Sequence, residues 1–338
     1  MTDRRRIGVT YASLMTLGPA MAQQAARWAD ELGYSSFWTA ETTGPEAFAT
    51  LAAISGARPD LDLGTGVLAL QLRTPMLAAM GAATLQSFAP ERTVHLGVGI
   101  SSPVVVGRWH GATYGTRALA QVREYLELTR ACLSGESVDH QGGFYRCRGF
   151  RLGVRLGERR PKLVLGALNE RMLQLAGELA DGVLLNYLPS SAVPWCVEQV
   201  RAGEAAAGRP AGSCEVHAYI HVGVADRDGA AEHARRDLFS YAVVPSYARA
   251  FARAGFQHEV DAITAAHAAR DRAAAVAAVS DRMVDAIDVV GTAEVVSSTV
   301  RSYIDAGVTS PVIMPLPWGE DRVAVVEATM RAAADGLP

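Results

Sequence analysis

The feature of this sequence that most restricts its fold is a regular alternation of short apolar segments with longer amphipathic ones. The longer segments have helical periodicity, and the first of them begins at Pro19 and ends before Gly33, as helices commonly do. Eight repeats of a strand followed by a right-handed helical crossover close a parallel sheet on itself. The pattern therefore predicts an α/β fold, a (β/α)8 TIM barrel. Its expected strands are 7–11, 36–40, 62–70, 93–100, 162–166, 182–186, 215–224 and 311–315.

Two segments interrupt the alternation without ending the domain. Residues 137–152 read as a hairpin that turns at Gly142 and Gly143, and residues 225–290 read as an alanine-rich helical insertion after the seventh strand. We expect one domain over 1–338 that carries both excursions, and we expect them to set substrate specificity. The alternative is an open, doubly wound sheet. That fold favours a glycine-rich phosphate loop directly after the first strand, and residues 11–17 (YASLMTL) contain no glycine.

The composition excludes several classes of protein. Of the 338 residues 49% are hydrophobic and 20% are charged, which is enough apolar side chain for a large core and excludes a mostly disordered chain. The net charge of −3 gives no electrostatic basis for binding nucleic acid. No apolar stretch reaches the length of a transmembrane helix, and the first residues lack the apolar core of a signal peptide. The four cysteines form no C-x-x-C pair, so we expect a reduced, cytoplasmic protein without membrane or nucleic-acid partners.

The chemistry of a TIM barrel lies at the carboxyl ends of its strands. The residues expected there are mostly aromatic or small, which suits a flat apolar ring. Glycines inside the third and fourth strands, at 66 and 99, indicate either a bulge with a close approach to the backbone or a tight barrel corner. His217 and His221 have the same strand parity, but no third ligand is near them in sequence. We therefore interpret them as ordinary strand histidines and expect no metal site.

The loop after the fifth strand opens a helix with small residues. Its free backbone amides could hold a phosphate, and Arg171 could add a charge-assisted hydrogen bond. Asn169 could equally serve as a plain helix cap. The sequence leaves both readings open.

Four segments in the first 190 residues together resemble one known family. They are 37–55 (beginning FWTAETTG), 63–88 (beginning LGTGVLALQLR), 96–111 (beginning LGVGISSP) and 175–186 (LAGELADGVLLN). In this order they resemble the bacterial-luciferase-like superfamily, and within it the oxidoreductases that use the deazaflavin coenzyme F420. The resemblance implies coenzyme F420 as the cofactor, with FMN as the alternative.

The resemblance also implies which residues contact the cofactor. Family members carry a bulge with a non-proline cis peptide in the third strand, and the matching bond here is Gly66–Val67. The fourth strand matches the wall of the cofactor pocket, and the loop opening the helix at 170 matches the site of the cofactor's phosphate tail. The residues implied as cofactor-binding are Thr39, Gly66, Val67, Leu68, Gly97, Gly99, Ile100, Ser101, Ser102, Gly166, Ala167, Leu168 and Arg171.

The implied reaction is hydride transfer between the cofactor and a small organic substrate, which needs a group to give or take a proton. Relatives often carry a histidine or aspartate in the second strand's end, where this chain has Thr39 to Thr42. Our candidates are Glu41, then His110, then Tyr11. Glu41 could instead form a structural salt bridge or cap, and His110 could be an ordinary loop histidine.

The resemblance leaves two alternative functions open, and it implies two partners. One alternative is an FMN-dependent monooxygenase of a two-component system, and the other is a non-catalytic flavin- or deazaflavin-binding protein. We expect a homodimer formed through the early helices, and a flavin or deazaflavin reductase as redox partner.

Overall fold

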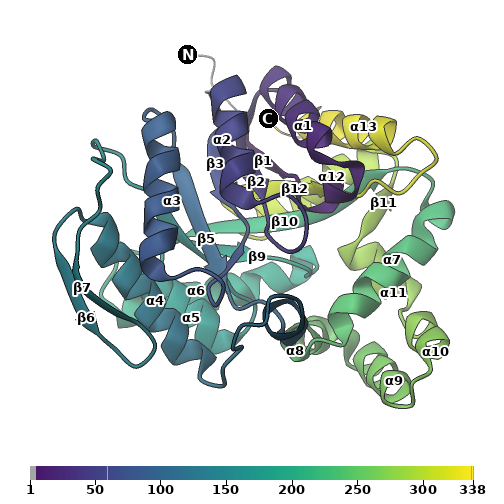
Figure 1. The fold of residues 1–338 in the computed structure, drawn as a ribbon. Coiled ribbons are helices and arrows are strands. Elements are labelled where there is room, and N and C mark those ends of the chain that lie inside the picture. The colour runs from purple at the N-terminus through teal and green to yellow at the C-terminus, as the bar shows by residue number, and fades with distance from the viewer. Residues whose placement is uncertain (1–4, 59, 336, 338) are drawn as a thin grey trace.

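Eight parallel strands form a closed barrel in the computed structural model, which describes residues 5–58, 60–335 and 337 (Figure 1). The strands are β1 (Arg5–Thr10), β2 (Tyr34–Thr39), β3 (Asp62–Thr65), β5 (Val94–Gly99), β8 (Lys162–Gly166), β9 (Gly182–Leu185), β10 (Glu215–Val224) and β12 (Ser310–Pro315). Neighbours pair in this order, and β12 pairs with β1. The predicted TIM barrel is confirmed. The open doubly wound sheet was wrong, because β9 pairs with β10 and closes the ring.

Eight helices cover the outside of the barrel: α1 (Pro19–Glu31), α2 (Ala47–Ala57), α3 (Pro75–Phe88), α4 (Ala118–Leu133), α5 (Glu170–Leu179), α6 (Val193–Ala206), α12 (Ala293–Asp305) and α13 (Arg322–Asp335). Apolar residues of the strands alternate between this helical layer and the barrel interior. In β1, Ile7 and Val9 belong to the core between strands and helices. The interior is filled by a second cluster of Trp38, Val164, Leu184, Tyr219, Val312 and Met314, so the barrel is packed rather than hollow.

The predicted hairpin is present as β6 (Val138–Gln141) and β7 (Arg146–Phe150), paired antiparallel. Glu124 of α4 fixes its turn, because its carboxylate accepts hydrogen bonds from the backbone N–H groups of Gly143, Phe144 and Tyr145. The hairpin therefore packs on the outer face of α4.

The predicted helical insertion follows β10. It consists of α7 (Arg227–Ala242), α8 (Pro245–Phe251), a π-helical turn η4 (Ala252–Phe256), α9 (Gln257–Ala268), α10 (Arg272–Ala277) and α11 (Asp281–Ile287). These helices lie to one side of the barrel and have a hydrophobic cluster of their own (Figure 1). The insertion ends earlier than its predicted boundary at 290, because β11 (Val289–Gly291) pairs with β10. Among the helices described, none is long and apolar enough to cross a membrane.

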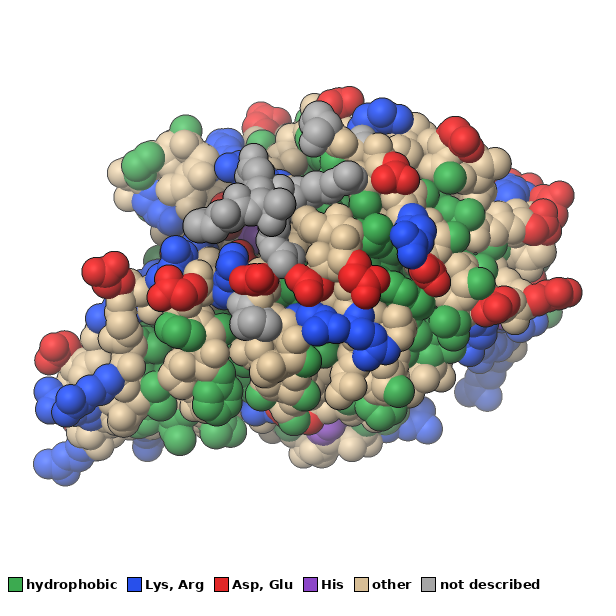
Figure 2. All heavy atoms as spheres, turned by 90° about the horizontal axis from the view of Figure 1, so that it is seen from above, with side chains coloured by type: hydrophobic (Ala, Val, Ile, Leu, Met, Phe, Trp, Pro, Cys, Tyr) green, Lys and Arg blue, Asp and Glu red, His purple; other side chains and the backbone are tan. Residues whose placement is uncertain are grey.

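Both chain ends lie at the end of the barrel where the strands begin (Figure 1). Figure 2 looks onto this end and shows acidic and basic side chains intermixed across it. Among the side chains that the structure describes on this face, the two signs of charge therefore alternate rather than gather into one patch.

Buried histidines give the barrel interior a pH dependence. His217 is 1% exposed, and its burial lowers its pKa to about 4. Since the unfolded chain then takes up the proton first, the stabilising contribution of neutral His217 is complete above about pH 6.5 and is lost as the pH falls toward 4.

We expect the melting temperature of the wild type to fall more steeply than that of His217→Gln between pH 6.5 and 4.5. Asp237, whose pKa burial raises to about 7, changes stability in the opposite direction, and its contribution cancels in this comparison. Calorimetry of both proteins across this range measures the difference. Parallel curves would contradict the assignment of a neutral buried His217.

Candidate active site

The third strand is interrupted at the mouth of the barrel. After β3 ends at Thr65, the chain resumes as β4 (Leu68–Ala69) along the same neighbour, β5. Gly64 pairs with His95 and Leu68 with Val98, so four steps along one strand match three along the other. This is a β-bulge with one extra residue. It contains the one cis peptide bond among the described residues, Gly66–Val67, as the resemblance implied.

Thr65 compensates for the broken ladder. Its hydroxyl donates to the carbonyl of Gly97 and accepts from the N–H of the same residue, both at 2.8 Å. One side chain thus satisfies two backbone groups that a continuous β3 would have paired. The N–H of Gly66 donates to the carbonyl of Thr39 at 2.7 Å, which anchors the bulge to β2 as well.

Glycines make room for the bulge. A Cβ on Gly97 would lie 1.8 Å from the carbonyl oxygen of Thr65, and one on Gly66 would lie 1.9 Å from the hydroxyl oxygen of Tyr219. A Cβ on Gly99 would lie 2.9 Å from Val67, and one on Gly166 3.3 Å from it. The strand glycines therefore mark a close approach of the backbone, one of the two readings that the sequence left open.

Val67 lies at the top of the packed barrel interior. It is partly exposed and packs, together with Ala12, on the interior cluster that includes Trp38 and Tyr219. Trp38 itself is fully buried below and donates to the hydroxyl of Ser36. The bulge is thus an apolar platform that faces the mouth. The close-packed side chains beneath it hold it in place.

Glu41 follows β2 at the rim and forms a two-pronged ion pair with Arg73. The guanidinium Nε and Nη2 donate to the carboxylate at 3.1 and 2.8 Å, and Arg73 also contacts Glu46. Burial acts to raise the pKa of Glu41, but the hydrogen bonds and charge of Arg73 prevail and hold it below its usual value. Glu41 is therefore a carboxylate at neutral pH and suits the role of proton acceptor.

The other two acid–base candidates lie in different surroundings. His110 is exposed, and its Nε2 lies 3.0 Å from the carbonyl oxygen of Thr42, so it shares the rim with Glu41. Tyr11 is fully buried between barrel and helices, and its hydroxyl donates to the carbonyl of Gly18. The structure therefore places His110 beside the loop that carries Glu41, and it places Tyr11 in the core between the barrel and its helices.

The loop after β5 is ordered by its own hydrogen bonds. The carbonyl of Ser101 accepts from the hydroxyl of Tyr114 at 3.1 Å, and the hydroxyl of Ser102 accepts from the N–H of Val105 at 3.2 Å. The latter starts the π-helical segment η2 (Val104–Trp109). Ile100 is half-buried beside them, whereas Thr39 and Leu68 are fully buried near the bulge.

The start of α5 differs from the plain cap considered from the sequence. Asn169 makes no side-chain capping bond. Its amide donates to the carbonyl of Ser246 in the insertion, and its oxygen accepts from Arg253 at 3.4 Å. Arg253 also donates to the carbonyl of Leu168 and stacks on Trp195, 3.8 Å from the ring centre. With exposed Arg171 in the first turn, the helix start carries two guanidinium groups beside its amides, a suitable site for an anion.

A buried polar network joins the mouth to the insertion. The Nδ1 of His221 lies 2.9 Å from Asp288, and its Nε2 lies 2.8 Å from the side-chain oxygen of Asn186. The hydroxyl of Tyr187 donates to Asp237 at 2.7 Å. Burial lowers the pKa of His221 to about 4 and raises that of Asp288, so burial disfavours the charged form of both groups.

Sequence reasoning missed Arg73, Arg253 and Asp288. Each acts on a partner at least 32 positions away, and nothing in the local pattern links the two. For Arg73 a signal was available: it follows the third strand, and the ends of neighbouring parallel strands meet at one edge.

Comparison with known proteins agrees with this geometry. The family model described as luciferase-like monooxygenase matches residues 6–310. A 5,10-methylenetetrahydromethanopterin reductase of Archaeoglobus fulgidus is 28% identical over 301 residues, 87% of this chain and 89% of the relative. A protein of Mycobacterium tuberculosis, provisionally named a coenzyme F420-dependent oxidoreductase, is 28% identical over 306 residues, 84% of this chain and 88% of the relative.

A solved structure shows the same fold over nearly the whole chain. The coenzyme F420-dependent tetrahydromethanopterin reductase of Methanopyrus kandleri superposes with a TM-score of 0.81 at 21% identity, covering 98% of this chain and 97% of the other. Together with the match over residues 6–310, the barrel and its bulge assign the protein to a family: it belongs to the luciferase-like monooxygenases.

Proposed function

We propose that this protein is an oxidoreductase that transfers a hydride between coenzyme F420 and a small organic substrate. The observation that carries the proposal is the glycine-lined bulge at Gly66–Val67, an apolar platform at the barrel mouth. The relatives named after F420 chemistry support the same cofactor.

The residues present fit a planar ring with a charged tail. The bulge and Ile100 offer the ring an apolar wall, and the loop from Gly166 to Leu168 leads to the helix start where Arg171 and Arg253 would bind a phosphate. The cofactor, when bound, supplies the hydride donor or acceptor. The chain's own residues exclude water from the platform and accept or donate the proton that accompanies the hydride transfer.

Proton transfer is proposed at the β2 rim. Glu41, ionised by Arg73, accepts the proton that a substrate loses when it gives up a hydride, and His110 lies beside the same loop. Tyr11 was the third candidate, but its hydroxyl is bonded to Gly18 within the core, so our proposal gives it no proton to transfer.

Parallel titrations with F420 and with FMN test the cofactor. Tryptophan fluorescence is a suitable readout, and we expect F420 to bind at least about tenfold more tightly, a difference of about 1.4 kcal/mol. Tighter binding of FMN would favour the two-component monooxygenase. Binding of F420 without turnover across a broad panel of alcohols, aldehydes and imines would favour a non-catalytic protein.

Arg253→Met should weaken F420 binding about tenfold and leave kcat within twofold, because the guanidinium is proposed to contact the tail and not the ring. Methionine keeps an apolar side chain of similar length and removes the guanidinium, whose carbon lies 3.8 Å from the centre of the Trp195 ring. The loss should shrink as salt is raised. Arg236→Met, which removes an exposed guanidinium paired with Glu232, is the matched control. An unchanged F420 affinity in the Arg253 variant would remove this residue from the tail site.

We also propose a homodimer that packs through α3. Leu77, Met80 and Phe88 on this helix are 46–60% exposed, which is unusual for large apolar side chains that cluster on one helix. Sedimentation of the wild type and of Phe88→Glu tests this, and a monomeric wild type would overturn it. A deazaflavin reductase is the proposed redox partner if the reaction consumes reduced cofactor.

A further inference from the structure

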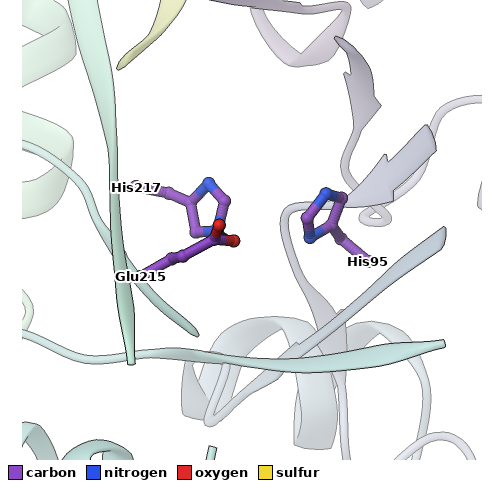
Figure 3. Close-up of side chains that lie close together, drawn as sticks. All are labelled: His95, Glu215 and His217. Atoms are coloured by element: carbon purple, nitrogen blue, oxygen red, sulfur yellow. Dashed lines mark ion pairs between the residues drawn. The ribbon is translucent and has the colours of Figure 1, made fainter. Parts of the chain in front are cut away.

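The floor of the barrel, at the opposite end from the mouth, holds a second cluster of chemically competent side chains. His217 and Glu215 lie on β10, and His95 lies on β5 (Figure 3). The two strands are separated by β8 and β9 in the sheet, so the side chains meet across the interior. One ligand atom from each of the three lies within 4.8 Å of the others.

Three imidazole nitrogens of this cluster lack a hydrogen-bond partner among the residues described. His95 is 6% exposed and His217 is 1% exposed. Among the residues described, Nδ1 of His95 and both ring nitrogens of His217 make no hydrogen bond. Buried polar atoms without a partner are rare, because each costs the free energy of desolvation without a compensating bond. The Oε2 atom of Glu215 lies 3.7 Å from Nε2 of His217.

The surroundings of the two rings suit metal ligands, because a buried, unpartnered imidazole nitrogen offers a lone pair that no protein group uses. Trp38 covers the pair, stacked on His95 at 5.0 Å and 5.1 Å from His217, which limits ring rotation.

Glu215 is the member of the cluster that reaches the surface. Glu215 also lines a surface cavity of about 410 Å³ at the floor, together with Lys162, Asp181 and Arg130. Its side chain is 42% exposed, so it connects the buried rings to solvent. Lys162 opposes a cation here, since its Nζ lies 3.2 Å from Oε2 of Glu215.

We propose that His95, His217 and Glu215 form a binding site for a divalent transition metal ion, of which Zn²⁺ is the preferred occupant. Two imidazoles and a carboxylate are a common zinc donor set, and the cavity leaves a fourth position for water. Tetrahedral coordination with ligand bonds of about 2.1 Å places ligand atoms about 3.4 Å apart, so the three side chains close in by at most about 1.4 Å. The ion would link β5 to β10 across the barrel and stabilise the fold at the end away from the mouth.

Titration of the metal-free protein with Co²⁺, followed by displacement with Zn²⁺, tests the proposal. We expect one equivalent of Co²⁺ with a visible absorption band typical of tetrahedral coordination, and a rise of a few degrees in melting temperature with saturating Zn²⁺. Glu215→Gln is the first variant, since its partly exposed position should tolerate the change. It should lose at least about tenfold in affinity while F420 binding stays the same.

Lys162→Met distinguishes metal binding by Glu215 from a purely structural role of this residue. Removing the ammonium group that competes for Glu215 should tighten metal binding about threefold or more. His217→Gln should abolish it. Asp288→Asn, in the network at the mouth, is the control, because His221, Asp237 and Asp288 are the other grouping that could hold an ion.

Three outcomes would overturn the proposal. The first is the absence of stoichiometric Co²⁺ binding at 100 micromolar, about the upper limit for a specific site. The second is binding that survives Glu215→Gln and His217→Gln, and the third is binding that is lost with Asp288→Asn and retained in those two variants. None of them bears on the hydride-transfer proposal, which the F420 titration tests at the opposite end of the barrel.

Discussion

Gly97→Ala is expected to be among the most damaging single-methyl additions to this protein. The new Cβ would lie 1.8 Å from the carbonyl oxygen of Thr65, and backbone cannot rotate away as a flexible side chain can. The same shift would break the two hydrogen bonds between the Thr65 hydroxyl and Gly97. We expect a loss of about 3 kcal/mol in the free energy of unfolding.

The measurement is denaturant unfolding together with F420 titration at low temperature. The bulge should be displaced even where the variant remains folded, so F420 affinity should fall at least about tenfold. Gly153→Ala is the matched control, since a Cβ at this exposed glycine meets nothing within 4 Å and should change stability by less than about 0.5 kcal/mol. Equal stability of the two variants would show that the bulge does not depend on its glycine cradle.

Glu41→Gln is expected to lower kcat about 100-fold or more and to change F420 affinity by less than threefold. Glutamine keeps the shape of the side chain but removes the carboxylate that would accept the proton, and general base catalysis is typically worth two to four orders of magnitude. Glu46→Gln is the matched control, because Glu46 contacts the same Arg73 and is more exposed. Equal losses in binding and turnover, or none, would remove Glu41 from this role.

The pH profile adds an independent check. A base must be deprotonated, and Arg73 holds the pKa of Glu41 below its usual value, so activity should persist on acidification to a lower pH than an ordinary glutamate would allow. Arg73→Met removes the charge and leaves the burial, which raises the pKa of Glu41. The acid limb of kcat/KM should then move to higher pH.

The barrel was predictable from sequence because its signals are local. Apolar runs such as those of β8 and β9 are buried on both faces, and their predicted starts match the observed ones. The strand β11 was missed, because three residues after a long helical segment leave no room for periodicity. Strand parity explains the position of Tyr11: it continues the outward face of Ile7 and Val9, whereas Gly8 and Thr10 face inward.

Within the candidate site, the bulge was predictable because glycines mark it in the sequence. Gly66, Gly97 and Gly99 stand out within strand patterns, and the structure uses them to accommodate the bulge. Charged or polar residues that pair across the site have no comparable signal in the local sequence. The pairing of Glu41 with Arg73 and the third member of the floor cluster, His95, depend on which strand ends and interior layers meet, and this is settled by tertiary packing.

The side chain of Asn169 links the start of α5 to the helical insertion. The side-chain amide nitrogen of Asn169 donates to Ser246 and its oxygen accepts from Arg253, so the segment 246–253 is a structural part of the proposed phosphate-binding site. Replacing the whole insertion between β10 and β11 with that of another protein would remove both hydrogen-bond partners of Asn169. Chimeras made to change specificity should therefore keep residues 246–253 and vary the rest of the insertion.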